Sequence, residues 1–287
     1  MGVGYGKNVT VADPCSYTIK FIYDYAIQGD RIVDPRRQDS MRTDWTTASV
    51  TTIDATALAS VVAAVQTQAE YATFIFGADG SVTTTARSPD SVTLVRATLA
   101  PGSLTGTPDR ECATFKLCDL ASALKGLKGT ATLEWLSGRV RIGDGRVRTV
   151  IALEGRDEDK LRIPDLDLSA SVMIPAESLS ALTGRTDPKV TSAYRFDVTP
   201  AGLTIDAADE TGIGSDLTIP ASDCIMIEGS ARAAYPWKPW ATFLKVIPKG
   251  TDILIELDID YPCRVTFAGE GWEGLWMVAP RIEAEDL

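Results

Sequence analysis

From Ala48 onward the chain alternates short apolar runs with turn signals. Ser49–Ile53 has the length and composition of a strand, and Asp54 is a typical helix N-cap. Apolar residues then recur at helical spacing through Gln68, which predicts an amphipathic helix. The following runs are short and bounded by turn residues, which favours strands. The expected strands are Ala72–Phe76, Ser81–Ala86, Val92–Leu99, Ala113–Leu117, Thr130–Trp135, Val140–Ile142, Val147–Leu153 and Leu161–Ile163, with a second helix near Cys118–Leu127.

The second half of the chain repeats this order. Glycine and alanine follow a phenylalanine at the same six-residue spacing in both halves, and a Leu-Lys pair precedes a Lys-Gly-Thr sequence in both. The two comparisons give offsets of 122 and of 120 to 121 residues, which indicates two copies of one domain. The matched positions are Phe74, Gly80 and Ala86 with Phe196, Gly202 and Ala208, and Leu124, Lys125 and Lys128 with Leu244, Lys245 and Lys249. In the second copy we expect a first strand at Ser171–Ile174, a first helix at Pro175–Thr183 and a second helix at Tyr235–Ile247.

Residues outside this pattern lie at the two ends. Residues 1–45 are Gly-rich at first, contain one alternating stretch at Tyr17–Tyr25 that reads as a strand, and are then strongly charged. At the other end an apolar run, Gly274–Val278, precedes Pro280 and an acidic tail, which predicts a last buried strand. The expected organisation is an N-terminal extension of unknown role at 1–45, domains at 46–164 and 170–287, and a short connector at 165–169.

Composition excludes many kinds of chemistry. The chain has no histidine, so it cannot form a Ser-His-Asp triad or a zinc site that contains histidine. It has no Walker A or dinucleotide-binding pattern, and its five cysteines form no CxxC pair. Asp258 and Asp260 share one face of an expected strand, but a solvated strand face explains them better than a catalytic carboxylate pair. We therefore expect no enzyme activity, no cofactor and no metal.

The net charge of −11 argues against nucleic-acid binding unless Lys and Arg gather on one surface. The chain has no run long enough to span a membrane and no secretory signal at its start. We expect a cytoplasmic protein that does not bind membranes.

Three segments resemble the sliding clamps of the proliferating cell nuclear antigen (PCNA) type, most closely the archaeal ones. They are Arg87–Val92, which resembles the loop after the third strand, Pro164–Leu168, which resembles the start of the interdomain connector, and Val278–Glu283, which resembles the terminal signature. The resemblance covers residues 46–287. It implies an α+β fold of two tandem clamp domains, with helices on the inner face and antiparallel sheets outside, closed head to tail as a homotrimeric ring. An archaeal cell, or an archaeal cell infected by a virus, is the location that it favours.

The resemblance implies a processivity factor that encircles duplex DNA without reading its sequence. Its partners would be DNA polymerase and a clamp loader, with flap nuclease and ligase as further partners. Weak attraction to phosphates requires Lys and Arg on or beside the inner helices. The candidates are Arg87, Lys125, Lys128, Arg185, Lys189, Lys238, Lys245 and Lys249. The first helix, Thr56–Gln68, has no Lys or Arg.

Clamps of this type also bind partner peptides in an outer apolar pocket. Carried over by position, that pocket uses Ser88, Pro89, Val92, Leu166, Leu168, Pro262, Met277, Ala279 and Pro280. Plain core packing explains Pro262 and Met277 equally well. The connector is shorter than in relatives, which predicts weakened peptide binding. Gln38, Met41 and Trp45 have the spacing of a clamp-binding peptide, but Asp44 replaces its other aromatic residue, so a polar linker is the better interpretation.

The seam between subunits is expected where unpaired edge strands meet. By family position it joins Asp159–Pro164 of one subunit to the strand near Gly214–Ile219 of the next, with Leu161 and Ile163 against Leu217 and Ile219. Two alternatives stay open. One is a clamp-derived scaffold that binds replication proteins without encircling DNA, and the other is a two-domain β-rich viral structural protein.

Overall fold

The computed structural model describes residues 47–155, 161–187, 189, 191–207 and 214–281. Contacts divide the chain into Met1–Trp45 and Thr46–Leu287, and everything below concerns the second unit. The expected strand at Tyr17–Tyr25 and the peptide-like residues Gln38, Met41 and Trp45 lie outside the described residues. Among the described residues, no helix is both long enough and apolar enough to cross a membrane.

The first copy begins as the sequence predicts. β1 (Ser49–Asp54) runs directly into α1 (Ala55–Gln66). The Asp54 carboxylate accepts hydrogen bonds from the backbone N–H groups of Thr56 and Ala57 at 2.8 and 2.9 Å, which satisfies two donors of the first helical turn. The remaining elements are β2 (Tyr71–Phe76), β3 (Val82–Arg87), β4 (Thr93–Leu99), β5 (Leu104–Thr105), β6 (Cys112–Lys116), α2 (Leu117–Leu124), β7 (Thr130–Leu136), β8 (Arg139–Gly143) and β9 (Arg148–Ala152).

Within the described residues the second copy repeats the first element by element, with the 3₁₀ turn η2 (Ala221–Asp223) added. Its strands pair in the same order as their counterparts, and every pairing is antiparallel. The repeat inferred from residue spacing is therefore present as a repeat of structure. The elements are β10 (Ala170–Pro175), α3 (Ala176–Thr183), β11 (Ala193–Thr199), β12 (Gly202–Asp206), β13 (Asp216–Pro220), β14 (Met226–Glu228), β15 (Ala231–Pro236), α4 (Trp237–Phe243), β16 (Asp252–Leu257), β17 (Cys263–Gly269) and β18 (Trp272–Val278).

The two copies are joined by one strand pair. β18 pairs with β4 over seven residues, from Trp272 opposite Leu99 to Val278 opposite Thr93. This pair makes a nine-stranded sheet with the order β14-β10-β16-β17-β18-β4-β3-β2-β6. The other two sheets of the described residues are a five-stranded sheet, β5-β1-β7-β8-β9, and a four-stranded sheet, β13-β12-β11-β15. Gly274–Val278 is thus a strand of the central sheet, as predicted.

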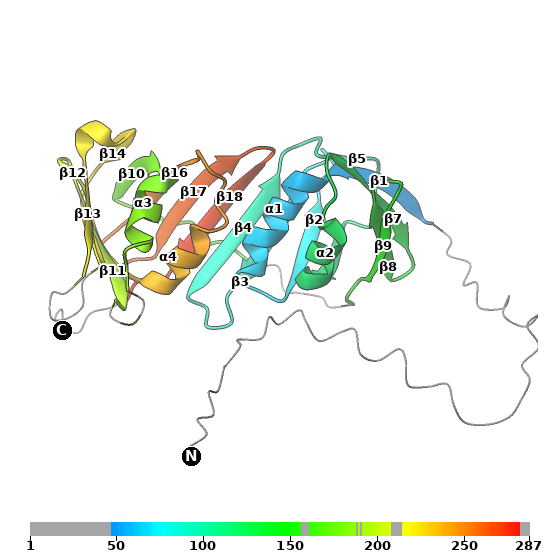
Figure 1. Ribbon diagram of the computed structural model, residues 1–287, viewed down its shortest axis with the longest axis horizontal. Coiled ribbons are helices and arrows are strands. Elements are labelled where there is room, and N and C mark those ends of the chain that lie inside the picture. Colours follow the sequence, from blue (N-terminus) through cyan, green and yellow to red (C-terminus); the bar gives the residue numbers. More distant parts are fainter. Residues whose placement is uncertain (1–46, 156–160, 188, 190, 208–213, 282–287) are drawn as a thin grey trace, which may run out of the picture. The chain divides into compact units, whose positions relative to one another are not determined.

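The helices lie on one face of this sheet (Figure 1). Trp276 of β18 is fully buried on that face, where its ring stacks on Phe243 of α4 with centroids 4.4 Å apart. The Val61, Val62 and Val65 side chains of α1 have no exposed surface. Burial of apolar side chains between the helices and the sheets is the main stabilising contribution to this fold.

Three predicted elements differ from the structure. Residues 161–169 form no strand, although Leu161 and Ile163 alternate with polar residues, and the last strand of the first copy is β9. The second helix of the first copy ends at Leu124 rather than Leu127, because Gly126 takes a φ of 83° that ends the helical path. Tyr235 belongs to β15 and pairs with Tyr194, so α4 begins only at Trp237.

Candidate functional site

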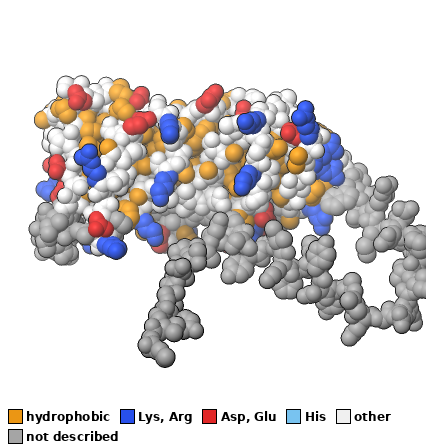
Figure 2. Space-filling model, viewed as in Figure 1, with side chains coloured by type: hydrophobic (Ala, Val, Ile, Leu, Met, Phe, Trp, Pro, Cys, Tyr) orange, Lys and Arg blue, Asp and Glu red, His pale blue; other side chains and the backbone are white. Residues whose placement is uncertain are grey.

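Seven of the eight predicted cations are exposed at or beside the ends of α2, α3 and α4. Lys125 is the C-cap residue of α2, and Lys245 follows the C-cap residue of α4. Lys238 is the second residue of α4, and Arg185 follows the C-cap glycine of α3. Lys128, Lys189 and Lys249 lie in the turns beyond α2, α3 and α4. Figure 2, which looks onto the helices, shows separate Lys and Arg side chains spread over this helix face.

These seven cations have few charged neighbours. Within the described residues none of them forms an ion pair with a carboxylate. One of them, Lys238, contributes to lowering the pKa of Asp90, which is lowered chiefly by hydrogen bonds from Ser88 and Val92. Cations without a protein partner on an acidic chain are free to attract external anions.

α1 is different from the other helices. Its exposed residues are Thr56, Ala63 and Gln66, so this longest helix presents neither positive nor negative charge to solvent. The structure therefore agrees with the sequence that attraction to an anion on the helix face would come from the ends of the other three helices.

Arg87 does not join the helix face. It lies opposite Leu94, which lies opposite Met277, which lies opposite Arg264 on successive strands. The neighbouring row contains Trp276 and faces the helices, and side chains alternate between faces along a strand. Arg87 therefore points to the outer face, away from the other seven predicted cations.

The predicted pocket residues converge at one end of the nine-stranded sheet, on its outer side. The start of β4, the end of β18 and the start of β17 meet there, because Thr93 pairs with Val278 and Val278 pairs with Cys263. The Ala279 N–H donates to the Val92 carbonyl at 2.8 Å, which ties the C-terminal tail to the loop before β4. Ser88, Pro89, Pro262 and Pro280 lie on these same segments and retain some exposure.

The connector also reaches this end of the sheet. Leu166 is buried, whereas Leu168 is half-buried. The pKa of the Arg264 guanidinium is raised mainly by two 2.7 Å hydrogen bonds to Glu256, and also by the nearby charge of Asp165. Met277, beside Arg264, is only 4% exposed, so it can form the floor of a site rather than its rim.

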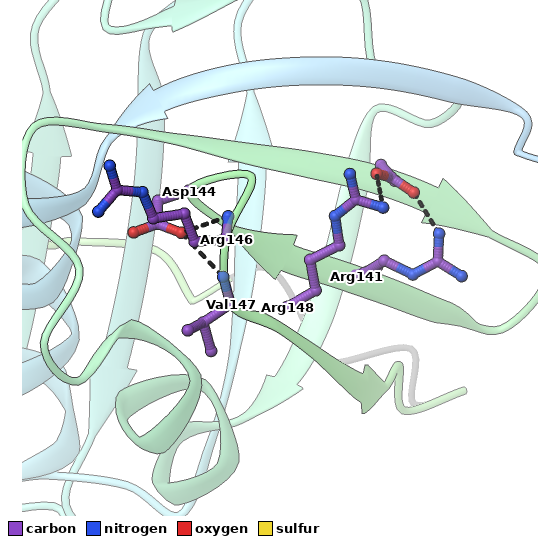
Figure 3. A network of polar contacts seen from close by, with 6 residues as sticks. Arg141, Asp144, Arg146, Val147 and Arg148 are labelled. Atoms are coloured by element: carbon purple, nitrogen blue, oxygen red, sulfur yellow. Dashed lines mark hydrogen bonds and ion pairs between the residues drawn. The ribbon is translucent and has the colours of Figure 1, made fainter.

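The structure also reveals a basic hairpin that sequence reasoning missed. β8, β9 and the turn between them carry Arg139, Arg141, Arg146 and Arg148, and Figure 3 shows the last three with Asp144 of that turn. Glu134 of β7 accepts a hydrogen bond from Arg141 at 2.5 Å and lies 3.9 Å from Arg148. These side chains line a shallow pocket with Thr132, Gly143 and Gly145. The repeated Arg-Val-Arg at 139–141 and 146–148 was the available sequence signal.

The proposed seam residues are placed unequally. Leu217 and Ile219 lie on β13, which forms one edge of the four-stranded sheet. These two residues are therefore on an edge strand, as the predicted seam requires. Leu161 and Ile163 lie on no strand, because β9 takes the outer position beside β8. The exposed edge of the first copy is therefore β9, and Leu161 and Ile163 cannot supply ladder hydrogen bonds there.

Comparison with known proteins supports the resemblance. A DNA polymerase sliding clamp from Methanothrix thermoacetophila is 30% identical over 152 residues, and the match spans 51% of this chain and 61% of that clamp. No model of a known protein family matches the chain.

Solved structures match over most of the described unit. The A. fulgidus PCNA with the C-terminal region of FEN-1 bound gives a TM-score of 0.73 at 22% identity, covering 82% of this chain and 99% of that one. The Thermococcus kodakaraensis PCNA gives 0.72 at 20% identity, covering 81% and 100%. The PCNA2–PCNA3 complex from Sulfolobus tokodaii gives 0.69 at 18% identity, covering 82% and 100%. The chain has the fold of the PCNA-type clamps, and the predicted α+β clamp fold is confirmed.

Proposed function

We propose that this chain is a DNA sliding clamp of the PCNA type, which encircles duplex DNA as a ring of three copies and tethers DNA polymerase as a processivity factor. Loading by a clamp loader and binding of flap nuclease and ligase belong to the same proposal. The sliding clamp of Methanothrix and the FEN-1-bound PCNA of A. fulgidus support it. The cytoplasm is the compartment in which such a protein would work.

One observation carries the ring. Within the described residues, the outer strands of the sheets are β5, β6, β9, β13, β14 and β15. By the repeat, β5 corresponds to β14 and β6 to β15, and these four are edges in both copies. β9 and β13 instead correspond to β18 and β4, which pair with each other. A second copy could satisfy one of these edges by repeating that join head to tail, and further copies leave no such edge free when the rotation of the contact closes a ring.

The helix face supplies the attraction to DNA. Its cations are exposed and unpaired, so they favour contact with phosphates at any sequence, while the net charge of −11 repels DNA from the rest of the surface. No three His, Cys, Asp or Glu side chains in the described part of the chain lie together as a metal site would require. Binding and sliding need no such site.

Replacing Lys125 and Lys245 by glutamate tests this role. We expect the double variant to shorten the DNA made per polymerase binding event on the order of tenfold, because each copy loses the cations at the C-terminal ends of α2 and α4 and gains two negative charges there. Primer extension over a salt series, with an archaeal polymerase and clamp loader, measures the effect.

Arg96→Glu is the matched control. Arg96 is exposed on β4, in the set of side chains that faces away from α1, so its charge lies far from the proposed DNA path. The control should extend primers like the wild type, and both variants should keep the wild-type mass in solution. Equal processivity of the lysine variant and the control at every salt concentration would show that these lysines do not face DNA.

A second candidate is a clamp-derived scaffold that binds replication proteins without encircling DNA. The uncharged surface of α1 favours it, because that helix has no Lys or Arg to attract phosphates. The scaffold would bind partner peptides at the Val92 and Ala279 end of the sheet, yet would be retained no longer on circular DNA than on linear DNA.

A further inference from the structure

The repeat fixes which residues of β9 and β13 would face each other. Ile142 of β8 and Val265 of β17 hold equivalent places in the two copies. Ile142 pairs with Thr149 of β9 and Val265 pairs with Trp276 of β18, so Thr149 corresponds to Trp276. In the same way Leu99 of β4 corresponds to Ile219 of β13, because they pair with the equivalent residues Val82 and Leu203.

Arg148 therefore corresponds to Leu275, and Asp216 corresponds to Arg96. Leu275 and Arg96 lie opposite each other in the join within the chain. If a second copy repeats this join, Arg148 of one copy lies opposite Asp216 of the next, and directly opposite residues in an antiparallel pair are about 4.5–5.5 Å apart at their Cα atoms.

Both side chains point to the same face. Asp216 pairs with Asp206, one position from the Leu217–Ile205 pair whose Ile205 is fully buried, so Asp216 faces outward. Arg148 pairs with Gly143 and lies one position from the Thr149–Ile142 pair, whose Ile142 is buried, so it also faces outward. On the opposite, helix side the next pair would join Leu217 to Val147, which is 63% exposed in a single copy.

The two charges are available for this pairing. Arg141 donates a hydrogen bond to the Glu134 carboxylate, whereas Arg148 lies 3.9 Å from that carboxylate (Figure 3). The Arg148 side chain is 55% exposed. Asp216 is exposed and forms no ion pair within the described residues. An opposing carboxylate would give Arg148 a partner of its own.

The surroundings are complementary in charge. Residues 138–150 contain four arginines and one aspartate, whereas residues 196–231 contain seven acidic residues and no Lys or Arg. Two β9 edges would bring arginines together, and two β13 edges would bring carboxylates together, so only the head-to-tail contact of β9 with β13 joins opposite charges.

We infer that Arg148 and Asp216 pair across the seam between copies of this chain, and that this pair selects the head-to-tail register. The inference rests on the proposed ring and adds the residues that determine its contact. It also replaces the expected contact through Leu161 and Ile163 with one through β9.

Charge exchange tests the inference. We expect Arg148→Asp and Asp216→Arg each to raise the dissociation constant of the trimer on the order of tenfold or more, because each places like charges opposite one another. The variant with both changes restores opposite charges at every seam and should assemble like the wild type. Sedimentation equilibrium at one fixed salt concentration measures the masses, and thermal unfolding of each variant verifies its fold.

The signs of the two single changes separate this pair from general repulsion. Arg148→Asp makes the chain more negative and Asp216→Arg makes it less negative, so repulsion between acidic copies alone would weaken one assembly and strengthen the other. Arg96→Asp and Glu273→Arg, exposed changes on the internal strands β4 and β18, are the matched controls and should leave the mass unchanged.

Four results would overturn the inference. Single variants that assemble like the wild type would leave the ring intact and refute only the pair, as would opposite effects of the two changes. A double variant no better than the singles would also refute the pair. A wild type that is monomeric under the same conditions would refute the ring of the proposed function, and the inference with it.

Discussion

At the scale of single residues, Gly80 and Gly102 separate two causes of glycine use. Both have a φ of 79°, which L-residues with a side chain rarely adopt. A Cβ on Gly80 would lie 2.6 Å from the Leu104 carbonyl oxygen, whereas a Cβ on Gly102 would meet no atom within 4 Å. Gly80 is thus held by close packing as well as by its backbone conformation.

Alanine at these two positions should therefore have different effects. We expect Gly102→Ala to lower the free energy of unfolding by about 1 kcal/mol, the cost of the left-handed conformation. Gly80→Ala should lower it by about 3 kcal/mol, since the β5 backbone must also move. Chemical denaturation of both variants measures the difference, and equal losses would show that β5 yields freely.

Sequence could predict some single residues and not others. Asp54 was predicted as an N-cap because its position before an amphipathic run specifies the hydrogen bonds that it accepts. The face on which Arg87 lies could not be predicted, because it depends on which side of the sheet the helices cover, and that involves contacts between residues distant in sequence.

At the scale of elements, the connector and the end of β18 form the proposed peptide site. Because β9 ends at Ala152 and β10 begins at Ala170, the connector runs over residues 153–169 rather than the expected 165–169. We expect peptides with the glutamine-aliphatic-aromatic motif to bind between this connector and β18. Met277→Ala should weaken binding by about 1 kcal/mol by removing apolar area at the floor of the site. Leu275→Ala, one row farther along the same face, should leave binding unchanged. Calorimetric titration in which both variants bind equally would place the peptide elsewhere.

The elements that sequence predicted well have strong local signals. α1 has a cap and a clear apolar face, and the strands around the glycine turns have alternating patterns. Leu161 and Ile163 imitate such an alternation, but a strand also needs a neighbour, and β9 already occupies the place beside β8. Tyr235 was assigned to a helix because burial against Tyr194 gives the same apolar signal in either conformation.

At the scale of the whole molecule, the repeat leaves β9 and β13 as edges whose counterparts are paired. Spacing in the sequence revealed the repeat, because matched turns and helix ends keep their distances. It could not reveal the arginine hairpin as a contact surface, since that role depends on which strand lies at the edge. The proposed ring rests on these edges, and the proposed DNA path rests on the helix face.

The most direct test of the ring is a topological link to DNA. Arg148→Cys with Asp216→Cys, in a chain whose five native cysteines are replaced by alanine, places thiols at opposed positions within disulfide range. The protein is oxidised in the presence of a circular plasmid, and the plasmid is then separated in detergent and high salt. We predict that covalent trimers stay with the intact circle and leave it after a single cut. Covalent trimers recovered free of the intact circle as readily as of the cut plasmid would contradict the claim that this protein encircles DNA.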